Sequence, residues 1–154
     1  MQHFVGGATR QQSACKGIEL VAESERVLIH DAARPVLPQK VIERLLAALA
    51  DHPGAIPVLP VIDSLAVDEA GLMAGSARRE TLRRVQTPQA FRTAAILAAH
   101  RSWQGEPVAG DDAQVLRAAG GTVALVAGNE ALAKLTFAED FMAETPTIRT
   151  GTGF

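Results

Sequence analysis

The chain has 154 residues, of which 47% are hydrophobic and 21% are charged, and its formal net charge at pH 7 is -2. These values are typical of one soluble globular domain and give no overall positive field, so we expect neither nucleic acid nor a membrane among its partners. No apolar run approaches the roughly 20 residues that span a bilayer, and the single cysteine excludes an intrachain disulfide. We therefore expect a cytoplasmic protein.

The first predicted elements surround a glycine pair. Residues 4–5 are expected to end a strand, Gly6 and Gly7 to form a turn, and Thr9 to cap a helix that continues to Val21. Backbone N–H groups between a strand and a helix start can bind an anion or a sugar hydroxyl. A simple turn between the two elements explains the same pattern, and at this point both interpretations stay open.

A short buried strand is predicted at residues 27–29, and the sequence HDAARP follows it directly. Asp31 would then lie at the carboxyl end of the strand, where open α/β sheets bind ligands. A carboxylate suits Mg²⁺ and the guanidinium of Arg34 suits phosphate, while the small Ala33 lets a ligand approach the backbone. The alternative is that Asp31 caps the turn and Arg34 is its partner on the surface.

A helix and a second strand are expected next. The helix runs from Pro38 to about Asp51, and the strand from Ala55 to Ile62. Two prolines within the strand indicate an edge position or an irregular stretch. The apolar face of the helix consists of Val41, Leu45, Leu46 and Leu49.

Residues 63–86 have a different pattern. Residues 63–67 alternate polar and apolar side chains, residues 68–71 form a turn signal, and residues 81–86 alternate less clearly. Two extended runs joined by polar turns predict a β-hairpin that projects from the sheet. Because an isolated hairpin is marginally stable, we expect a homodimer formed through this arm. Most of the arginines at positions 78, 79, 83 and 84 are expected to be solvated charge.

The remaining elements complete an alternation of strands and helices, which predicts an α/β domain with a mainly parallel sheet. Asp111 or Asp112 is expected in a first helical turn, where an acid interacts favourably with the helix dipole. After a closing segment at 87–91, the expected elements are a helix over 92–100, a helix from 110–112 to the glycines at 120–121, a strand over 122–127, a short run from Lys134, and a helix over 138–143.

Several motifs occur in an order that is characteristic of one family. The more specific ones are HDAARP at residues 30–35 and TPQAF at residues 87–91. Between and around them lie Gly6-Gly7 with Arg10 and Ser13, the pair Asp63-Ser64, Arg79, the pair Asp111-Asp112, and Lys134 with Thr136. Together they resemble the 2-C-methyl-D-erythritol 4-phosphate cytidylyltransferase family, over residues 4 to about 144.

The resemblance implies a Rossmann-like domain with a projecting β-hairpin arm. It implies transfer of a cytidylyl group from CTP to 2-C-methyl-D-erythritol 4-phosphate, with release of pyrophosphate, in non-mevalonate isoprenoid precursor synthesis. Mg²⁺ is the expected cofactor, with CTP and the polyol phosphate as ligands. In the family the arms of two subunits interlock, so Ser64 and Arg79 are expected to serve the partner's site.

The resemblance also assigns roles to single residues. The expected catalytic residues are Lys134 and Arg79, and the expected metal ligand is Asp31. The expected nucleotide-binding residues are Gly6, Gly7, Ala8, Ser13, Asp31 and Ala33. The expected substrate-binding residues are Arg34, Asp63, Ser64, Arg79, Thr87 and Lys134.

The end of the chain carries a second match. Residues 148–154 resemble the opening strand of the 2-C-methyl-D-erythritol 2,4-cyclodiphosphate synthase that is fused to this enzyme in bifunctional forms. We therefore expect a cytidylyltransferase domain over 1–144 and a linker with the first strand of a synthase domain over 145–154. The family's basic, glycine-rich N-terminal loop is missing, so we expect this fragment to be inactive alone.

The sequence departs from the family pattern at several positions, and two other functions stay open. Ala8 stands where the family has an acid, Ser64 and Gly110 stand where it has threonines, and Leu132 with Ala133 stands where it has an Asn-Ile pair. One alternative is a cytidylyltransferase for another polyol phosphate, such as ribitol phosphate. The other is a non-catalytic fragment that dimerises through its hairpin.

Overall fold

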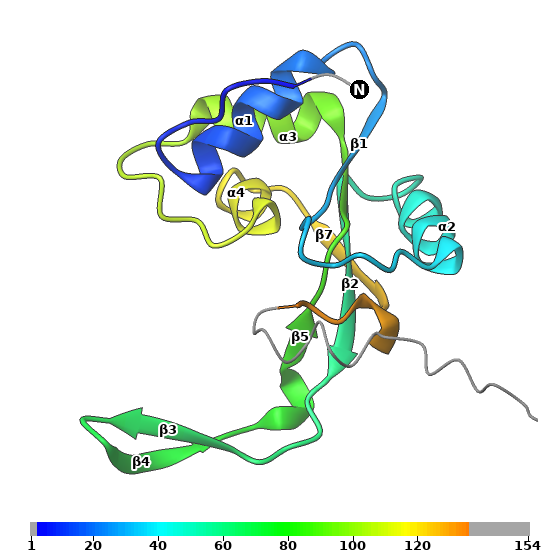
Figure 1. The fold of residues 1–154 in the computed structure, drawn as a ribbon. Helices are drawn as coiled ribbons and strands as arrows, with labels where there is room; N and C mark the ends of the chain where they lie inside the picture. The colour runs from blue at the N-terminus through cyan, green and yellow to red at the C-terminus, as the bar shows by residue number, and fades with distance from the viewer. Residues whose placement is uncertain (1–2, 136–154) are drawn as a thin grey trace, which may run out of the picture.

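A computed structural model describes residues 3–135 of the chain. One β-sheet forms the centre, helices cover both of its faces, and a hairpin extends away from it (Figure 1). The helices are α1 (Arg10–Leu20), α2 (Gln39–Ala48), α3 (Thr93–Ser102) and α4 (Asp112–Ala118), with 3₁₀ turns at Arg79–Thr81 and Glu130–Leu132. None of the helices in this part of the chain is long and apolar enough to cross a membrane.

The main sheet is mixed. It contains β1 (Arg26–Ile29), β2 (Gly54–Pro60), β5 (Arg83–Val85), β6 (Gln89–Arg92) and β7 (Val123–Ala127), in the order β1-β6-β2-β5 with β7 also paired to β2. The α/β prediction is confirmed, and β1, β2 and β7 run in one direction. Because β5 and β6 run the opposite way, only the β2–β7 pair is parallel in the described sheet.

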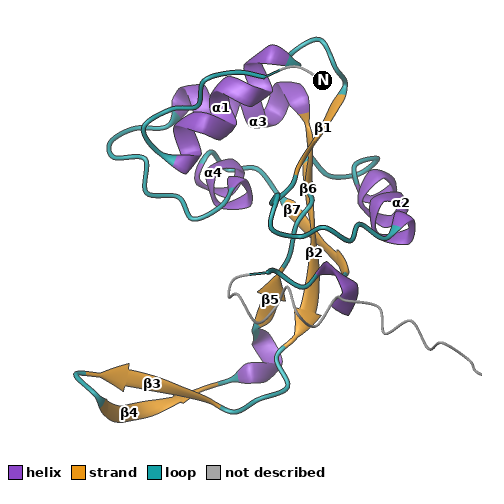
Figure 2. Cartoon of the chain, in the orientation of Figure 1, coloured by secondary structure: helices purple, strands orange, loops and turns teal. Residues whose placement is uncertain are grey.

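Strand β6 is not among the expected elements, because the sequence indicates TPQAF only as the end of the hairpin segment. Its side chains alternate between the two faces of the sheet, so that Ala90 and Phe91 are both fully buried on opposite sides. The strand lies between β1 and β2, as Figure 2 shows. A four-residue strand that is buried on both faces has no alternating pattern by which the sequence could reveal it.

The expected edge position of the second strand is wrong, because β2 has neighbours on both sides. Pro57 is tolerated because it lies where the neighbour of β2 changes from β6 to β5. Its carbonyl accepts the backbone N–H of Gln86 at 2.9 Å. Proline has no N–H to donate on that same side, but this side faces the break between β5 and β6, so no ladder hydrogen bond within either strand is lost.

Two apolar cores lie on opposite faces of the sheet. The first joins α1, α3 and α4 to the sheet, and the second lies under α2, in agreement with the apolar face expected for that helix (Figure 1). Thr9 caps α1 and Asp111 caps α4 with their side-chain oxygens, as expected for these residue types. The first core includes Ile18, Ile56, Phe91, Ile96, Leu97, Val115 and Leu116, and the second includes Val41, Leu45, Leu49 and Leu132.

The predicted hairpin arm is present, but its second strand is not the one expected. Strand β3 (Leu65–Glu69) pairs with β4 (Leu72–Ala77) through a turn in which Ala70 and Gly71 have positive φ angles. Residues 83–85 instead form β5, which belongs to the main sheet. The arm lies well away from the helices in Figure 1.

Three other expectations concern the ends of the chain. Residues 4–5 are in an irregular segment rather than at the end of a strand. The expected helix at 138–143 and the segment at 148–154 lie outside the described residues.

Candidate active site

Asp31 lies just beyond the carboxyl end of β1 and faces two cations. Its Oδ2 is 3.6 Å from Nε of Arg34 and 3.5 Å from Nζ of Lys134, which comes from the far end of the described chain. The expected convergence of Asp31 and Lys134 is therefore present in the structure. An ion pair of this kind brings together a carboxylate for a metal and two cations for phosphate groups.

Arg34 is held from inside the protein, and its side chain is only 12% exposed. One of its terminal nitrogens donates to the carbonyl of Leu132, and the backbone N–H of Leu135 donates to the carbonyl of Ala33 at 2.8 Å. These bonds fix the segment that carries Lys134 against the HDAARP loop. Arg34 is thus a partner of Asp31, as the alternative interpretation expects, but it is largely buried rather than on the surface.

Thr87 connects the two specific motifs. Its hydroxyl accepts the backbone N–H of Asp31 at 3.0 Å and lies 3.0 Å from Nδ1 of His30. The other ring nitrogen of His30 is 2.9 Å from the carbonyl of Arg34, which can only accept. We assign the proton of a neutral His30 to Nε2, so that the Thr87 hydroxyl donates to Nδ1. The sequence does not single out His30, although its position within HDAARP is the available signal.

The glycine loop is closely packed on the start of α1. The backbone N–H of Gly7 donates to Oγ of Ser13 at 2.9 Å, and that of Ala8 donates to Oε1 of Gln12 at 2.9 Å. A Cβ on Gly7 would lie 2.3 Å from Cβ of Gln12, so only glycine fits there. Because side chains of α1 already accept both N–H groups, these two donors favour the simple turn over an anion-binding loop.

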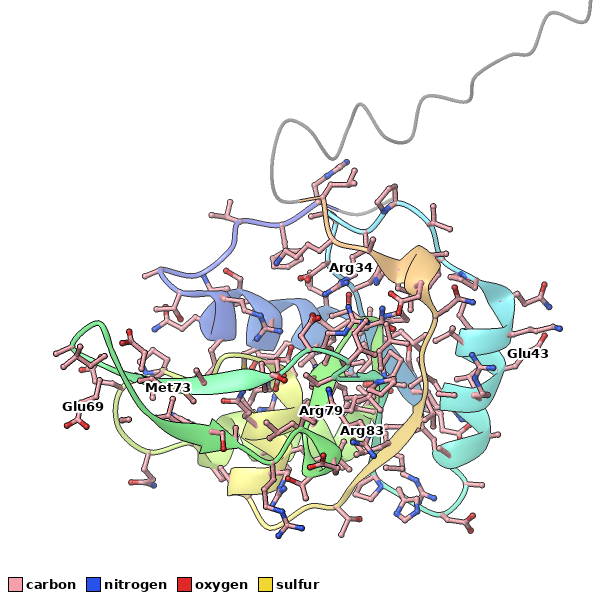
Figure 3. All side chains as sticks on the ribbon, turned by 90° about the horizontal axis from the view of Figure 1, so that it is seen from below. Arg34, Glu43, Glu69, Met73, Arg79 and Arg83 are labelled. Atoms are coloured by element: carbon pink, nitrogen blue, oxygen red, sulfur yellow. The ribbon has the colours of Figure 1, made fainter. Side chains whose placement is uncertain are left out.

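The arm carries the remaining expected residues. Asp63 and Ser64 are exposed at its base. Arg79 donates to the carbonyl of Ile62 at 2.7 Å and lies 3.8 Å from the carboxylate of Glu80. Figure 3 shows Arg79 on the arm side of the molecule, apart from Arg34. Within one chain, the structure therefore groups Asp31, Arg34, Thr87 and Lys134, the Asp31 cluster, and leaves Asp63, Ser64 and Arg79 outside it.

A cavity of about 290 Å³ lies beside the Asp31 cluster. Arg34, Lys134 and Arg84 line it together with Glu130, whose carboxylate is 2.9 Å from Arg84. The excess of cations suits an anionic ligand. The sequence groups Arg84 with the solvated arginines, and its position at the cavity is a feature that sequence spacing does not reveal.

A second polar cluster holds α1 to α4. The fully buried Asp112 accepts hydrogen bonds from Arg10 and from His100, the latter at 3.0 Å. Burial on its own raises the pKa of the Asp112 carboxyl, but the bonds from His100 and Arg10 outweigh it and hold the pKa below its usual value. Asp111, by contrast, caps the helix through the backbone N–H of Gln114. The two neighbouring acids therefore have different structural roles.

Metal binding by protein groups alone is not supported in the described residues, since no three His, Cys, Asp or Glu side chains come together there. Asp31 is partly exposed and a single carboxylate. Such a group fits Mg²⁺ when phosphate oxygens and water supply the other ligands. The residues present therefore fit a metal that arrives with a nucleotide.

Comparisons with known proteins agree with this geometry. The family model described as 2-C-methyl-D-erythritol 4-phosphate cytidylyltransferase matches residues 1–149. A bifunctional enzyme IspD/IspF from Erythrobacter litoralis is 62% identical over 151 residues, which cover 97% of this chain and 39% of the relative. A 2-C-methyl-D-erythritol 4-phosphate cytidylyltransferase from Cereibacter sphaeroides is 50% identical over 138 residues, covering 88% of this chain and 60% of the relative.

Solved structures show the same fold. The 2-C-methyl-D-erythritol 4-phosphate cytidylyltransferase of Thermus thermophilus superposes with a TM-score of 0.78 at 38% identity, over 91% of this chain and 69% of that chain. The bifunctional IspDF of Campylobacter jejuni gives a TM-score of 0.77 at 31% identity, over 90% of this chain and 35% of that chain. The chain thus spans well under half the length of the bifunctional relatives that it matches.

Proposed function

The chain belongs to the 2-C-methyl-D-erythritol 4-phosphate cytidylyltransferase family, and we propose that it contributes the site at which CTP reacts with a methylerythritol phosphate. In this reaction a phosphate oxygen of the acceptor bonds to the α-phosphorus of CTP. The bond from that phosphorus to the bridging oxygen breaks, and pyrophosphate leaves. The observation that carries the proposal is the Asp31 cluster, in which a carboxylate and two cations meet at the end of a strand.

The cluster supplies what such a transfer needs. Phosphoryl-type transfers depend on in-line positioning and on neutralising oxyanion charge more than on a covalent nucleophile. Lys134, a compact cation, would lie beside the reacting phosphate, and Arg34 would bind the acceptor phosphate. The buried Nε of Arg34 has no hydrogen-bond partner among the described residues, so it has a proton to offer to a phosphate oxygen.

Asp31 would hold Mg²⁺ against the nucleotide. The bound ion would neutralise phosphate charge and help to orient the triphosphate. In the structure Asp31 pairs with Lys134 and Arg34, and a cation at the carboxylate would release the Lys134 side chain and leave Nε of the fixed Arg34 to face a phosphate oxygen. This exchange accounts for the presence of cations and a carboxylate at one place.

The arm would complete the site of a second copy. Its tip exposes apolar side chains, with Leu72 and Met73 each about three-quarters exposed. At its base, Arg79 lies apart from Arg34 of its own chain (Figure 3), and Ser64 is exposed. A homodimer through the arm would bury the apolar tip and give Arg79 and Ser64 a phosphate ligand in the partner's site.

The test measures pyrophosphate release by the intact protein that contains this chain, with CTP, Mg²⁺ and 2-C-methyl-D-erythritol 4-phosphate, and with ribitol phosphate as a second acceptor. We expect release to depend on CTP, on the divalent cation and on the methylerythritol phosphate. Preference for ribitol phosphate would reassign the acceptor. Self-association without any binding of CTP would instead favour the non-catalytic alternative.

A further inference from the structure

Gln86 lies directly before Thr87 and lines the cavity beside the Asp31 cluster, but its side-chain hydrogen bonds go to a residue outside that cluster. Its side chain is buried, with 4% of the residue exposed, in the short break between β5 and β6. Its backbone N–H donates to the carbonyl of Pro57 at 2.9 Å, which ties it to the central strand β2. A buried amide side chain at such a place needs partners for both its N–H and its C=O groups.

Both partners come from one residue, Asn129. The Nε2 of Gln86 donates to the carbonyl of Asn129 at 2.8 Å, and the backbone N–H of Asn129 donates to Oε1 of Gln86 at 3.1 Å. This reciprocal pair has the form of a residue pair in a β-ladder, with a side chain in place of one strand. The two bonds therefore fix both the orientation of the Asn129 backbone and its distance from Gln86.

The preceding residue is adapted to the same contact. The backbone N–H of Gly128 donates to the carbonyl of Val58 at 2.9 Å. A Cβ on Gly128 would lie 2.1 Å from Oε1 of Gln86, so any larger residue would displace the amide. Gly128 and Gln86 are thus complementary in shape.

The segment held in this way leads into the Asp31 cluster. The side chain of Asn129 caps the 3₁₀ turn Glu130–Leu132 by accepting the backbone N–H of Ala131 at 2.9 Å. The carbonyl at the end of that turn, from Leu132, binds Arg34, and Lys134 follows two residues later. The position of Lys134 therefore depends on where Gln86 holds Asn129.

We propose that Gln86 is a positioning residue, which docks residues 128–132 on strands β2 and β5 and thereby sets where Lys134 meets Asp31. The inference rests on the proposed function for the role of Lys134, but the docking itself is a property of the structure. Gln86 touches no reacting group. Its removal should alter the chemical step more than the binding of the nucleotide.

The experiment uses the intact protein that contains this chain, with Gln86→Met, which keeps the shape and removes both hydrogen bonds, and Gln86→Glu, which keeps only the acceptor. Displacement of a reacting group by about 1 Å can lower a rate about 100-fold. We expect kcat to fall by between about tenfold and about 100-fold in both variants, with the KM for CTP changed less than about twofold. The matched control is Gln39→Met on the exposed surface of α2.

A second measurement does not need activity. Hydrogen exchange of the backbone amide of Leu135, which donates to Ala33, reports the docking of the segment beside Lys134. We expect faster exchange there in both variants and unchanged exchange in α3. If the wild type shows no CTP-dependent turnover, the proposed function fails, while this measurement still decides the docking.

Unchanged kcat together with unchanged exchange at Leu135 in Gln86→Met would overturn the proposal. Loss of folding in both variants would also overturn it, because Gln86 would then be a general core residue. A rise in the KM for CTP with an unchanged kcat would overturn it as well, since the effect would then lie in nucleotide binding.

Discussion

At Asp31, one carboxylate oxygen is shared by two cations that differ in their freedom to move. Arg34 is fixed by the Leu132 carbonyl and is mostly buried, whereas the Lys134 side chain is about half exposed. The flexible ammonium of Lys134 can follow the reacting phosphate as negative charge develops on it, whereas the fixed guanidinium of Arg34 can hold the phosphate of the bound acceptor. This difference favours the proposal that Lys134 acts in the chemical step and that Arg34 binds the acceptor.

In the intact protein that contains this chain, we expect Lys134→Met to lower kcat for pyrophosphate release by a factor of about 100 or more. Loss of one preorganised group that stabilises a developing oxyanion costs on the order of 10²–10³ in kcat. Steady-state rates with saturating CTP and acceptor measure the effect. Lys40→Met, on the exposed face of α2, is the control and should retain the wild-type rate. A wild-type rate in Lys134→Met would remove this lysine from the reaction.

Asp112 offers a residue-scale test of stability. Its pKa is lower in the folded protein than in the unfolded chain, so its charge stabilises the fold above the unfolded pKa, and this contribution is lost as the pH falls through the folded pKa. We expect Asp112→Asn to reduce the free energy of unfolding at pH 7 by about 3 kcal/mol, since it leaves the buried His100 and the partly exposed Arg10 without a charged partner.

Urea unfolding at pH 7 and near pH 3 measures this difference, which should shrink at the lower pH. Asp111→Asn is the matched control, because asparagine caps a helix as well as aspartate does. A gap between Asp112→Asn and the wild type that stays constant with pH would contradict the ionised state of Asp112.

Among the elements, the hairpin arm is the one whose stability the described chain does not explain. Strands β3 and β4 pair with each other and form a separate sheet, and the side chains at their tip are exposed. Two-stranded hairpins are marginal in water. The arm therefore needs a partner surface, and the dimer proposal provides one.

We expect the double substitution Leu72→Asp with Met73→Asp to weaken dimerisation by at least about tenfold. Burial of one such apolar side chain contributes about 1.5–3 kcal/mol. Light scattering over a range of protein concentrations measures the dissociation. Val108→Asp, at an equally exposed apolar position outside the arm, is the control. Activity should fall with dimerisation if Arg79 serves the partner's site, and an unchanged dimer would exclude this interface.

In the molecule as a whole, the sheet joins two cores that share no helix. Phe91 contributes to the core under α1, α3 and α4, while its neighbour Ala90 contributes to the core under α2. The site lies at the end of β1, which packs on both layers, with Val27 and Ile29 against the first core and Leu28 against the second. Its geometry should therefore depend on cooperative folding of the two layers.

We expect Leu45→Ala, in the core under α2, to reduce the free energy of unfolding by about 2–5 kcal/mol. The only tryptophan, Trp103, packs against the opposite core. The unfolding midpoint measured by its fluorescence should coincide with the midpoint measured by far-UV circular dichroism, both in the variant and in the wild type. Two separated transitions would show that the layers unfold independently.

The sequence by itself determined the local features of this protein. The cap at Thr9, an acid in the first turn of α4, the apolar face of α2 and the strand before Asp31 follow from residue type and spacing, because their physical causes act within a few residues. The motif order indicated the family, and the expected meeting of Asp31 with Lys134 came from that resemblance and is confirmed.

The tertiary structure decided which segments meet and in what direction. Strand β6, the central position of β2 and the true second strand of the arm depend on pairing between distant segments, which no local pattern specifies. The same holds for His30, Arg84 and Gln86, whose importance lies in partners far along the chain. Hydrogen bonds and ion pairs of this kind need precise distances, and only the packed sheet with its helices sets those distances.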